Sequence, residues 1–232
     1  SILRDTMADI DGYGRGKING AYAYGGAELA LKTVNQNFGL NITRYAVVDY
    51  DGFESLIDRI GGVELPVTDA EAEQINRNMF EVINARYKSG MLTYDGAWEV
   101  YNREKLSAGG DNLRLSGLQA LGYARIRKLD SDFVRVERQQ RVVQAIYRQL
   151  GTLDLMQLTG VMTAYIGKVN TNVTLAQAAS LLSSVMGYSD VQVQTLRVPA
   201  DGAYRSDMLS DTYYIIPKLE RCRQDIAAFL GS

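Results

Sequence analysis

The segment 45–67 constrains the fold more than any other part of this sequence. It opens with a short apolar run at 45–50, which suits a buried strand, and continues into a helical pattern that Asp51 caps. Two glycines end that pattern before a second strand at 63–67. Strand, helix and strand in this order indicate a βαβ unit in a sheet covered by helices. We therefore predict an α/β fold whose sheet is covered by helices.

The rest of the chain shows mainly helical patterns. Helices are expected at 26–38, 118–124, 133–150, 153–165, 174–185 and 217–230. A strand is expected at 191–198, and the glycine-rich stretch at 11–17 is expected to be a loop. Polar and glycine-rich stretches at about 68–115 indicate a surface insertion. Because the 232 residues contain no linker or repeat, we predict a single domain over 1–232.

Two residue types are nearly or wholly missing, and this excludes several kinds of active site. The chain has no histidine and one cysteine. Histidine-based nucleophilic triads, His-ligated zinc or copper, and disulfides within the chain are therefore excluded. We expect Cys222 to pack in the core beside Leu219, Ile226 and Phe229, with a reactive thiol as the alternative.

Charge is distributed unevenly along the chain. The net charge is −2 and the pI about 5.3, which argues against a general nucleic-acid-binding protein. Between 125 and 148, however, seven basic residues stand against three acidic ones, a local net charge of +4. The basic residues are Arg125, Arg127, Lys128, Arg135, Arg138, Arg141 and Arg148, and the acidic ones are Asp130, Asp132 and Glu137.

The spacing within this basic segment indicates a binding site for phosphate. On a helix, Arg135, Arg138 and Gln139 share one face, and Arg125 and Arg127 point the same way if their segment is extended. Six of the seven basic residues are arginines, whose planar guanidinium can hold a phosphate through two hydrogen bonds. We therefore predict a phosphate-bearing ligand. The alternative is a solvated face on which these arginines pair with the neighbouring acids.

Weaker patterns leave their alternatives open. The stretch 12–17 lacks the spacing of a dinucleotide-binding loop and the hydroxyl residue of a P-loop. Asp130 and Asp132 could hold magnesium, although loop carboxylates are more often helix caps or arginine partners. The apolar stripes at 153–165 and 175–186 are expected in the core, with a lipid-chain pocket as the alternative. The fifteen tyrosines could line a ligand groove or simply pack half-buried.

Six segments in the first 150 residues carry a family resemblance. They are 1–6 (SILRDT), 17–26 (KINGAYAYGG), 48–53 (VDYDGF), 61–64 (GGVE), 118–127 (LQALGYARIR) and 132–141 (DFVRVERQQR). Together, and in this order, they resemble the LytR-CpsA-Psr family. The remainder of the chain is compatible with the closing helices and strand of that family.

The resemblance implies a fold, a location and an activity. It specifies the α/β fold as a layered α-β-α sandwich around a central mixed β-sheet. It implies a domain at the extracytoplasmic face of the cell membrane, tethered by an N-terminal transmembrane anchor expected upstream of Ser1. It also implies a magnesium-dependent phosphotransferase that moves a glycopolymer, such as teichoic acid or capsule, from an undecaprenyl diphosphate carrier onto peptidoglycan through a phosphodiester bond. Hydrolysis of the diphosphate would be a side activity. Nucleic acid is not an expected partner.

The resemblance also assigns residues to the site. The diphosphate would be held by Arg4, Arg125, Arg127, Arg135 and Gln139, of which Arg4, Arg125 and Arg127 would be catalytic. Lys17, Asn19, Asp132 and Arg138 would line or brace the site. The arginines would neutralise charge that develops on the transferring phosphoryl group and the leaving diphosphate.

The sequence departs from the family pattern at two points. Leu3 stands where the family commonly has proline, which we expect to be tolerated. The magnesium-binding aspartates of the family are expected upstream of Ser1, so the metal ligands are left unassigned, and Asp5 and Asp132 could at most assist. Two other functions compete with transfer: a non-catalytic polyprenyl-phosphate-binding module, and a DNA-binding regulator, which the acidic charge and the missing basic recognition helix disfavour.

Overall fold

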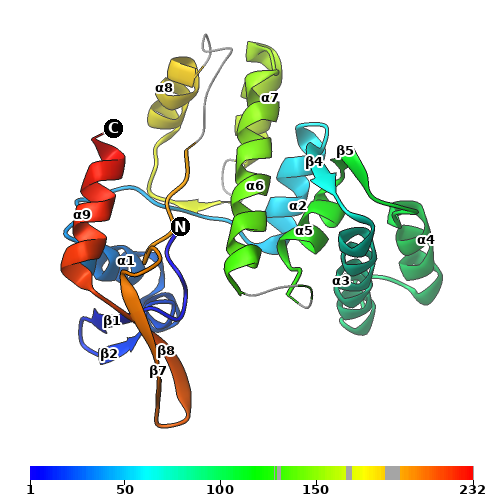
Figure 1. Ribbon diagram of the computed structural model, residues 1–232. Helices are drawn as coiled ribbons and strands as arrows, with labels where there is room; N and C mark the ends of the chain where they lie inside the picture. The colour runs from blue at the N-terminus through cyan, green and yellow to red at the C-terminus, as the bar shows by residue number, and fades with distance from the viewer. Residues whose placement is uncertain (128, 130–131, 166–168, 186–193, 232) are drawn as a thin grey trace. The chain divides into compact units, whose positions relative to one another are not determined.

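The computed structural model describes residues 1–127, 129, 132–165, 169–185 and 194–231 (Figure 1). These residues form two compact units. Unit 1 comprises Ser1–Val47, Thr171–Val173 and Gln194–Ser232, and unit 2 comprises Val48–Asn170 and Thr174–Val193. Each unit has a hydrophobic core of its own. The prediction of a single domain over 1–232 stays a prediction.

Unit 1 is built on two antiparallel hairpins. Its strands are β1 (Met7–Ile10), β2 (Gly14–Lys17), β7 (Tyr204–Leu209) and β8 (Thr212–Pro217). β1 pairs with β2 and β7 pairs with β8, while a parallel bridge between Thr6 and Ile215 links the two hairpins. A second parallel bridge pairs Ile2 with Val198. Strand directions in this unit are therefore mixed.

Two helices complete unit 1. They are α1 (Gly20–Phe38), which is kinked at two glycines, and α9 (Leu219–Leu230). Gly39 ends α1 in the left-handed conformation at φ +68°, as predicted from the sequence. Beside β3 (Ala46–Val47), the Thr171 hydroxyl of β6 (Asn170–Thr171) donates to the Tyr45 carbonyl. The core is formed by Ala8, Ile18, Phe38, Val198, Ala203, Cys222 and Ile226.

The predicted core position of Cys222 is confirmed. Its side chain is buried in this cluster and its Sγ lies 3.8 Å from the Ala203 carbonyl oxygen. Burial raises the pKa of the Cys222 thiol, and the negative charge of Asp225 adds to the shift. The thiol is therefore a packing group of low reactivity.

Unit 2 is mainly helical. Its elements are α2 (Tyr50–Arg59), β4 (Val63–Val67), α3 (Asp69–Lys88), α4 (Tyr94–Glu104), β5 (Gly110–Leu115), α5 (Gly117–Ala124), α6 (Asp132–Gly151), α7 (Leu155–Tyr165) and α8 (Leu175–Val185). β4 and β5 form an antiparallel ladder in which Val63 lies opposite Leu115. The core includes Ile57, Leu65, Ile75, Met79, Tyr123, Ile126 and Val142. No helix among the described residues is long and apolar enough to cross a membrane.

Helices α2 and α5 approach each other closely at one glycine. A Cβ atom on Gly117 would lie 2.1 Å from the carbonyl oxygen of Glu54, so only glycine fits at the start of α5. The side chain of Ser116 caps α5, and Gln119 bonds back to the Ser116 amide to complete a capping box. The N-terminus of α5 is thereby held at a fixed place beside α2.

The α/β class is confirmed, but the strands are arranged differently from the expected βαβ unit. In the described part of the chain the named strands pair two by two, and β4 takes the antiparallel β5 as its partner. The expected buried strand at 45–50 shrinks to β3, beside which Val48 is 44% exposed. Asp49, rather than Asp51, caps α2, because its carboxylate accepts from the Gly52 amide at 2.8 Å.

The segment 68–115, expected to be a surface insertion, supplies part of the core of unit 2. Helix α3 buries one stripe, which comprises Ala72, Ile75, Met79 and Ile83, and β5 completes the only ladder that β4 forms among the described residues. Most positions between these four residues are polar, which hides the stripe in the sequence. Helix α4 has no buried residue, so the segment has both core and surface parts, and its being an insertion stays a prediction.

Two hairpins were not predicted. The glycine-rich stretch at 11–17 contains the turn between β1 and β2 as well as β2 itself, and β7 and β8 were missed altogether. Of the strand expected at 191–198, residues 191–193 lie outside the described residues, and the described remainder makes a bridge at Val198. The predicted helices at 118–124, 133–150 and 153–165 correspond to α5, α6 and α7.

A pair of methionines tests whether α3 belongs to the core. Met79 is 0% exposed and Met91 is 70% exposed. Met79→Ala should lower the free energy of unfolding by about 2 to 5 kcal/mol because it opens a cavity, whereas Met91→Ala should change it by about 0.5 kcal/mol or less. Urea unfolding followed by circular dichroism measures both. Equally small losses would show that α3 lies outside the cooperative core.

Candidate functional site

A polar pocket in unit 2 collects two of the predicted catalytic arginines. Arg125 and Arg127 line a cavity of about 230 Å³ together with Tyr50, Gln74, Asn78 and Glu81. Tyr50 begins α2, the next three residues of the lining lie on α3, and the arginines follow the end of α5. We call this cavity the arginine pocket.

The two arginines are held by the residue between them. Ile126 is buried in the core, which anchors the short segment after α5. Arg125 has helical dihedral angles (φ −93°, ψ −2°). The segment therefore does not begin as the extended chain in which Arg125 and Arg127 were expected to point the same way. Both side chains nevertheless line the same cavity.

The electrostatic balance of the arginine pocket is positive. The guanidinium of Arg125 lies 5.3 Å from the centroid of the Tyr50 ring and 3.8 Å from a carboxylate oxygen of Glu81, which is a loose ion pair. Arg127 is exposed and adds a second positive charge to the lining. Two guanidiniums against one carboxylate leave a net positive cavity, which favours an anionic ligand.

The remaining predicted residues of the basic segment lie on α6 and have different surroundings. Arg138 is buried and its Nε donates to Glu71 Oε1 at 2.8 Å, while Arg135 is also buried. Gln139 is exposed, and its amide nitrogen donates to the Ala124 carbonyl at 3.3 Å, beside Arg125. The side chain of Asp132, and the whole of Asp130, lie outside the described residues.

Glu71 is a residue that the sequence analysis missed. Its carboxylate accepts from the Thr68 amide at 3.0 Å in the capping box of α3 and also accepts from Arg138. The side chains of Glu71 and Arg138 are 9% and 5% exposed, so this is a buried ion pair. The Thr-x-x-Glu spacing at 68–71 indicates the cap, but nothing local indicates the arginine partner. Arg138 therefore braces α6 against α3, one of the two roles expected for it.

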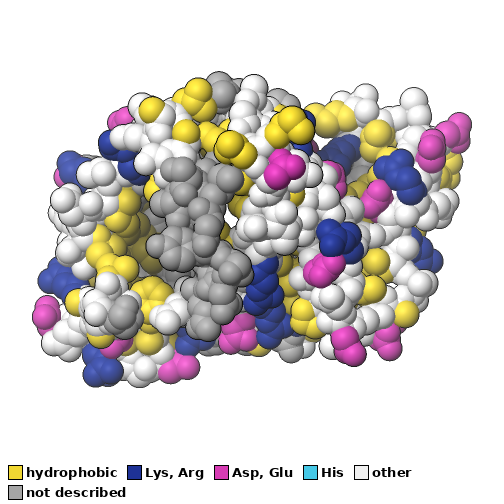
Figure 2. All heavy atoms as spheres, turned by 90° about the horizontal axis from the view of Figure 1, so that it is seen from above, with side chains coloured by type: hydrophobic (Ala, Val, Ile, Leu, Met, Phe, Trp, Pro, Cys, Tyr) yellow, Lys and Arg dark blue, Asp and Glu magenta, His cyan; other side chains and the backbone are white. Residues whose placement is uncertain are grey.

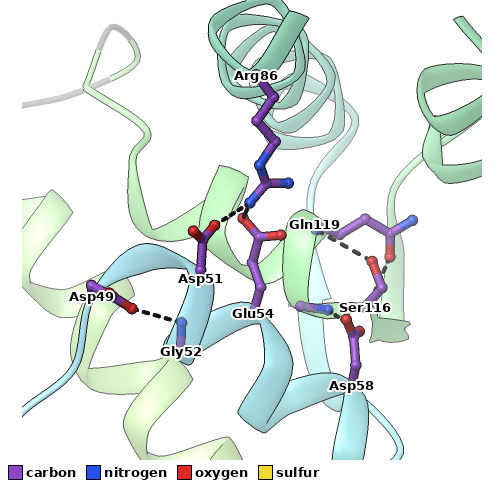
Figure 3. A network of polar contacts seen from close by, with 9 residues as sticks. Asp49, Asp51, Gly52, Glu54, Asp58, Arg86, Ser116 and Gln119 are labelled. Carbon is purple, nitrogen blue, oxygen red and sulfur yellow. Dashed lines mark hydrogen bonds and ion pairs between the residues drawn. The ribbon is translucent and has the colours of Figure 1, made fainter. Parts of the chain in front are cut away.

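A second polar network connects the three elements that line the arginine pocket (Figure 3). Arg86 of α3 reaches Asp51 and Glu54 of α2, at 2.7 and 2.8 Å. Asp58 of α2 accepts from the amide of Gly117 at the start of α5, at 2.7 Å. The relative positions of α2, α3 and α5 are thus fixed by charged hydrogen bonds as well as by apolar packing.

The pKa of Glu54 is raised by this environment. Burial raises the pKa of Glu54 and outweighs the opposing hydrogen bond and charge of Arg86, while the negative charges of Asp51 and Asp58 push it further upward. The folded state therefore holds a proton on Glu54 more tightly than the unfolded chain does. This contribution to stability decreases as the pH rises above the ordinary value for glutamate.

Three predicted residues come together in unit 1. Lys17 Nζ lies 2.8 Å from the Asp5 carboxylate, and Arg4 Nε lies 3.3 Å from it. The backbone N–H of Asn19 donates to the backbone carbonyl of Arg4 at 3.4 Å. Lys17 also lies 5.7 Å from the ring centroid of Tyr214. Burial of Asp5 acts to raise its pKa, but the hydrogen bond and charge of Lys17 and the charge of Arg4 outweigh it, so the pKa is lowered. Asp5 is ionised and neutralised by two cations.

The described residues contain no group of three or more carboxylate or thiol side chains that could hold a metal ion. Of the two aspartates that could assist a metal, Asp132 has its side chain outside the described residues, and the carboxylate oxygens of Asp5 are already bonded to Lys17 and Arg4. The described residues alone therefore do not offer the set of oxygen ligands that magnesium takes in near-octahedral geometry. The expectation of a magnesium cofactor stays a prediction.

The fold and the arginine pocket together define a mixed α/β protein with a net positive cavity, which favours an anionic ligand. In the space-filling view, Lys and Arg side chains lie in small groups among acidic and hydrophobic ones (Figure 2).

A profile of the LytR_cpsA_psr family matches residues 1–225. The chain belongs to this family, as the sequence resemblance indicated.

Curated relatives cover nearly the whole chain. The regulatory protein MsrR of Staphylococcus aureus (strain COL) is 35% identical over 88% of this chain and 55% of its own length. The polyisoprenyl-teichoic acid–peptidoglycan teichoic acid transferase TagU of Bacillus mycoides is 30% identical over 97% of this chain and 64% of its own length. The chain thus spans little more than half of the relatives it matches.

Solved structures share the fold. TagT bound to LIIa-WTA has a TM-score of 0.73 and 24% sequence identity, covering 100% of this chain and 78% of that one. The LytR-CPS2A-psr family protein YwtF (TagT) with bound octaprenyl pyrophosphate lipid has a TM-score of 0.67 and 23% identity, covering 100% of this chain and 78% of that one. These likenesses establish the fold of the chain described above.

Two arginines of the predicted site, Arg138 and Arg127, should differ in how much they contribute to the stability of the fold. Arg138→Ala should lower the free energy of unfolding by about 3 to 5 kcal/mol, because it leaves Glu71 charged and buried without its partner. Arg127→Ala, at an exposed position, should change it by about 0.5 kcal/mol or less. Denaturant unfolding at pH 7 measures both losses. A stable Arg138→Ala variant would contradict the bracing role.

The Arg86 network should show a characteristic pH dependence. Arg86→Met should lower the free energy of unfolding by about 2 kcal/mol at pH 7, because Glu54 stays buried without its cation. Near pH 4.5 the deficit should shrink, because Glu54, whose pKa is already raised, takes up a proton in the folded state. Urea unfolding at both pH values tests this, with Arg77→Met on the exposed side of α3 as control. A deficit independent of pH would disprove the link to Glu54.

Proposed function

We propose that this chain is a phosphotransferase that moves a glycopolymer from an undecaprenyl diphosphate carrier onto peptidoglycan. The observation that carries the proposal is the arginine pocket, where Arg125 and Arg127 share one cavity with a single, loosely paired carboxylate, Glu81. The similar proteins support this proposal. One relative is a teichoic acid transferase, and a related structure contains bound octaprenyl pyrophosphate lipid.

Electrostatics make a diphosphate a suitable ligand for this pocket. Opposite unit charges about 4 Å apart attract by roughly 4 kcal/mol at an effective dielectric constant of about 20. The planar guanidinium can also donate two parallel hydrogen bonds to one phosphate. Arg125 and Arg127 would therefore hold a doubly charged group more strongly than either could hold a carboxylate alone.

The proposed reaction exchanges one phosphoester bond for another. A hydroxyl oxygen of peptidoglycan attacks the phosphorus atom next to the glycopolymer, and the bond from that phosphorus to the bridging oxygen of the diphosphate breaks. Polyprenyl phosphate leaves with the bridging oxygen, the hydroxyl proton passes to solvent or a base, and a phosphodiester remains. Arg125 and Arg127 neutralise the charge that develops on the transferring and leaving groups.

The other predicted residues fill supporting roles in this proposal. The family resemblance also assigns diphosphate binding to Arg4 of unit 1, where Lys17 and Asn19 lie beside it. Gln139 and Arg135 would act from α6, which Arg138 braces through Glu71. Magnesium dependence, an extracytoplasmic location and a membrane anchor upstream of Ser1 are further parts of the proposal that follow from the family.

Removal of both pocket arginines should abolish the reaction. Arg125→Ala/Arg127→Ala should weaken binding of an undecaprenyl diphosphate-linked glycopolymer about 100-fold or more, since each charged hydrogen bond contributes about 1.5 to 3 kcal/mol. Native mass spectrometry measures the binding, and incorporation of labelled glycopolymer into peptidoglycan, with and without EDTA, measures transfer. Transfer should fall with binding, and EDTA should abolish it.

Arg77→Ala is the matched control, because Arg77 is an exposed arginine of the same unit that pairs with Glu73 on α3. It should leave binding and transfer unchanged. Unaltered binding in the double variant would contradict the proposed diphosphate site. Binding without transfer by the unmodified protein, with magnesium present, would instead identify a polyprenyl-phosphate-binding module.

A further inference from the structure

Helices α3 and α4 form a second cavity, and five of its eight lining residues are aromatic. It has a volume of about 260 Å³ and lies within unit 2. The lining consists of Phe80, Ile83, Asn84, Tyr87, Tyr94, Ala97, Trp98 and Tyr101. We call it the aromatic cleft. The mechanism proposed above makes no use of it.

Each helix contributes one face to the aromatic cleft. The lining residues of α3 begin at Phe80 and those of α4 at Tyr94, and both sets follow the spacing i, i+3, i+4, i+7. Such a stripe normally faces a core. Here, four of the five rings are between 43% and 61% exposed, namely Phe80, Tyr87, Tyr94 and Trp98. The two helices therefore present large aromatic area to solvent at a concave surface, which is typical of a binding site.

The rings of the aromatic cleft pack edge to face. Phe80 and Tyr101 are 5.7 Å apart, Trp98 and Tyr101 are 6.0 Å apart, and Tyr87 and Tyr94 are 6.1 Å apart, all with interplanar angles above 70°. In this geometry each contact covers the face of one ring at most. By contrast, Tyr13 and Tyr24 in unit 1 are stacked at 4.5 Å and cover each other. Ring faces in the cleft remain available to a ligand.

The chemistry of the lining selects a neutral ligand with both apolar and polar surfaces. None of the eight lining residues is charged, unlike the lining of the arginine pocket. Three tyrosine hydroxyls, the Trp98 indole N–H and the Asn84 amide supply hydrogen-bonding groups at the edges of the rings. A hydrocarbon chain would leave these groups unmatched, and unpaired polar groups reduce affinity.

We propose that the aromatic cleft binds a sugar ring of a neutral glycan. A pyranose has C–H groups on its faces and hydroxyls around its rim. Its C–H groups fit the negative faces of aromatic rings, and its hydroxyls fit the donors and acceptors at the ring edges. The volume of about 260 Å³ accommodates a ring of this size but is too small for a long helix or strand of another protein.

The position of the cleft on α3 relates it to the arginine pocket. Asn78 of the pocket and Asn84 of the cleft lie on this one helix, about 9 Å apart along its axis at 1.5 Å per residue. That separation is on the scale of a short oligosaccharide. The assignment of the bound glycan to the transferred polymer or its acceptor rests on the proposed function, whereas sugar binding itself does not.

Trp98 provides a direct test because it is the only tryptophan of the chain. The probe is chitotetraose, a neutral β-1,4-linked N-acetylglucosamine oligomer, titrated while Trp98 fluorescence is recorded. The signal should change saturably, with millimolar affinity. Tyr87→Ala and Tyr94→Ala should each weaken the affinity at least fivefold, while Tyr213→Ala, an exposed tyrosine of β8, should leave it unchanged.

Two comparisons keep this test independent of folding and of the proposed function. Circular dichroism should show that the tyrosine variants remain folded, since both side chains are exposed. The Arg125→Ala/Arg127→Ala variant should retain chitotetraose binding even where diphosphate binding is lost. Absence of a saturable change, or a saturable response to 1-octanol but not to chitotetraose, would overturn the proposal.

Discussion

The buried ion pair between Glu71 and Arg138 is the interaction on which the candidate site depends. Two opposite charges can stay in a region of low exposure only while they neutralise each other. Glu71 also closes the capping box of α3, so a single carboxylate fixes both the start of that helix and the position of α6. α3 supplies three residues of the arginine pocket, and α6 carries Arg135 and Gln139. The arrangement of the pocket therefore relies on a buried contact between α3 and α6.

Local patterns in the sequence predicted the features that depend on neighbours in the chain. The end of α1 at Gly39 and the helices α5, α6 and α7 all follow from spacing over a few residues, whereas Arg125 and Arg127 share one cavity although Arg125 is helical rather than extended. Helical periodicity also suggested that Arg135 and Arg138 belong to one site, although it could not show that both are buried. Family motifs added Arg4, Lys17 and Asn19, which do lie together in unit 1.

Features that depend on distant residues could not be predicted in this way. The partner of Arg138 lies 67 residues away, and β4 pairs with β5, which follows it only after the two helices α3 and α4. The buried stripe of α3 escaped notice because Glu71 and Gln74, both buried, look like surface residues in a sequence. Polar residues that are buried together with their partners are the reason the core position of α3 could not be recognised in the sequence.

The single buried cysteine has a practical consequence for the study of this protein. Cys222 is enclosed by the core of unit 1 and its thiol has a raised pKa, so thiol reagents reach few thiolates in the folded chain. A cysteine introduced at an exposed position such as Met91, close to the aromatic cleft in sequence, would react first. Few thiol reagents should therefore label the natural chain, and one fluorophore or spin label could be attached at position 91, between α3 and α4, without removing a core residue.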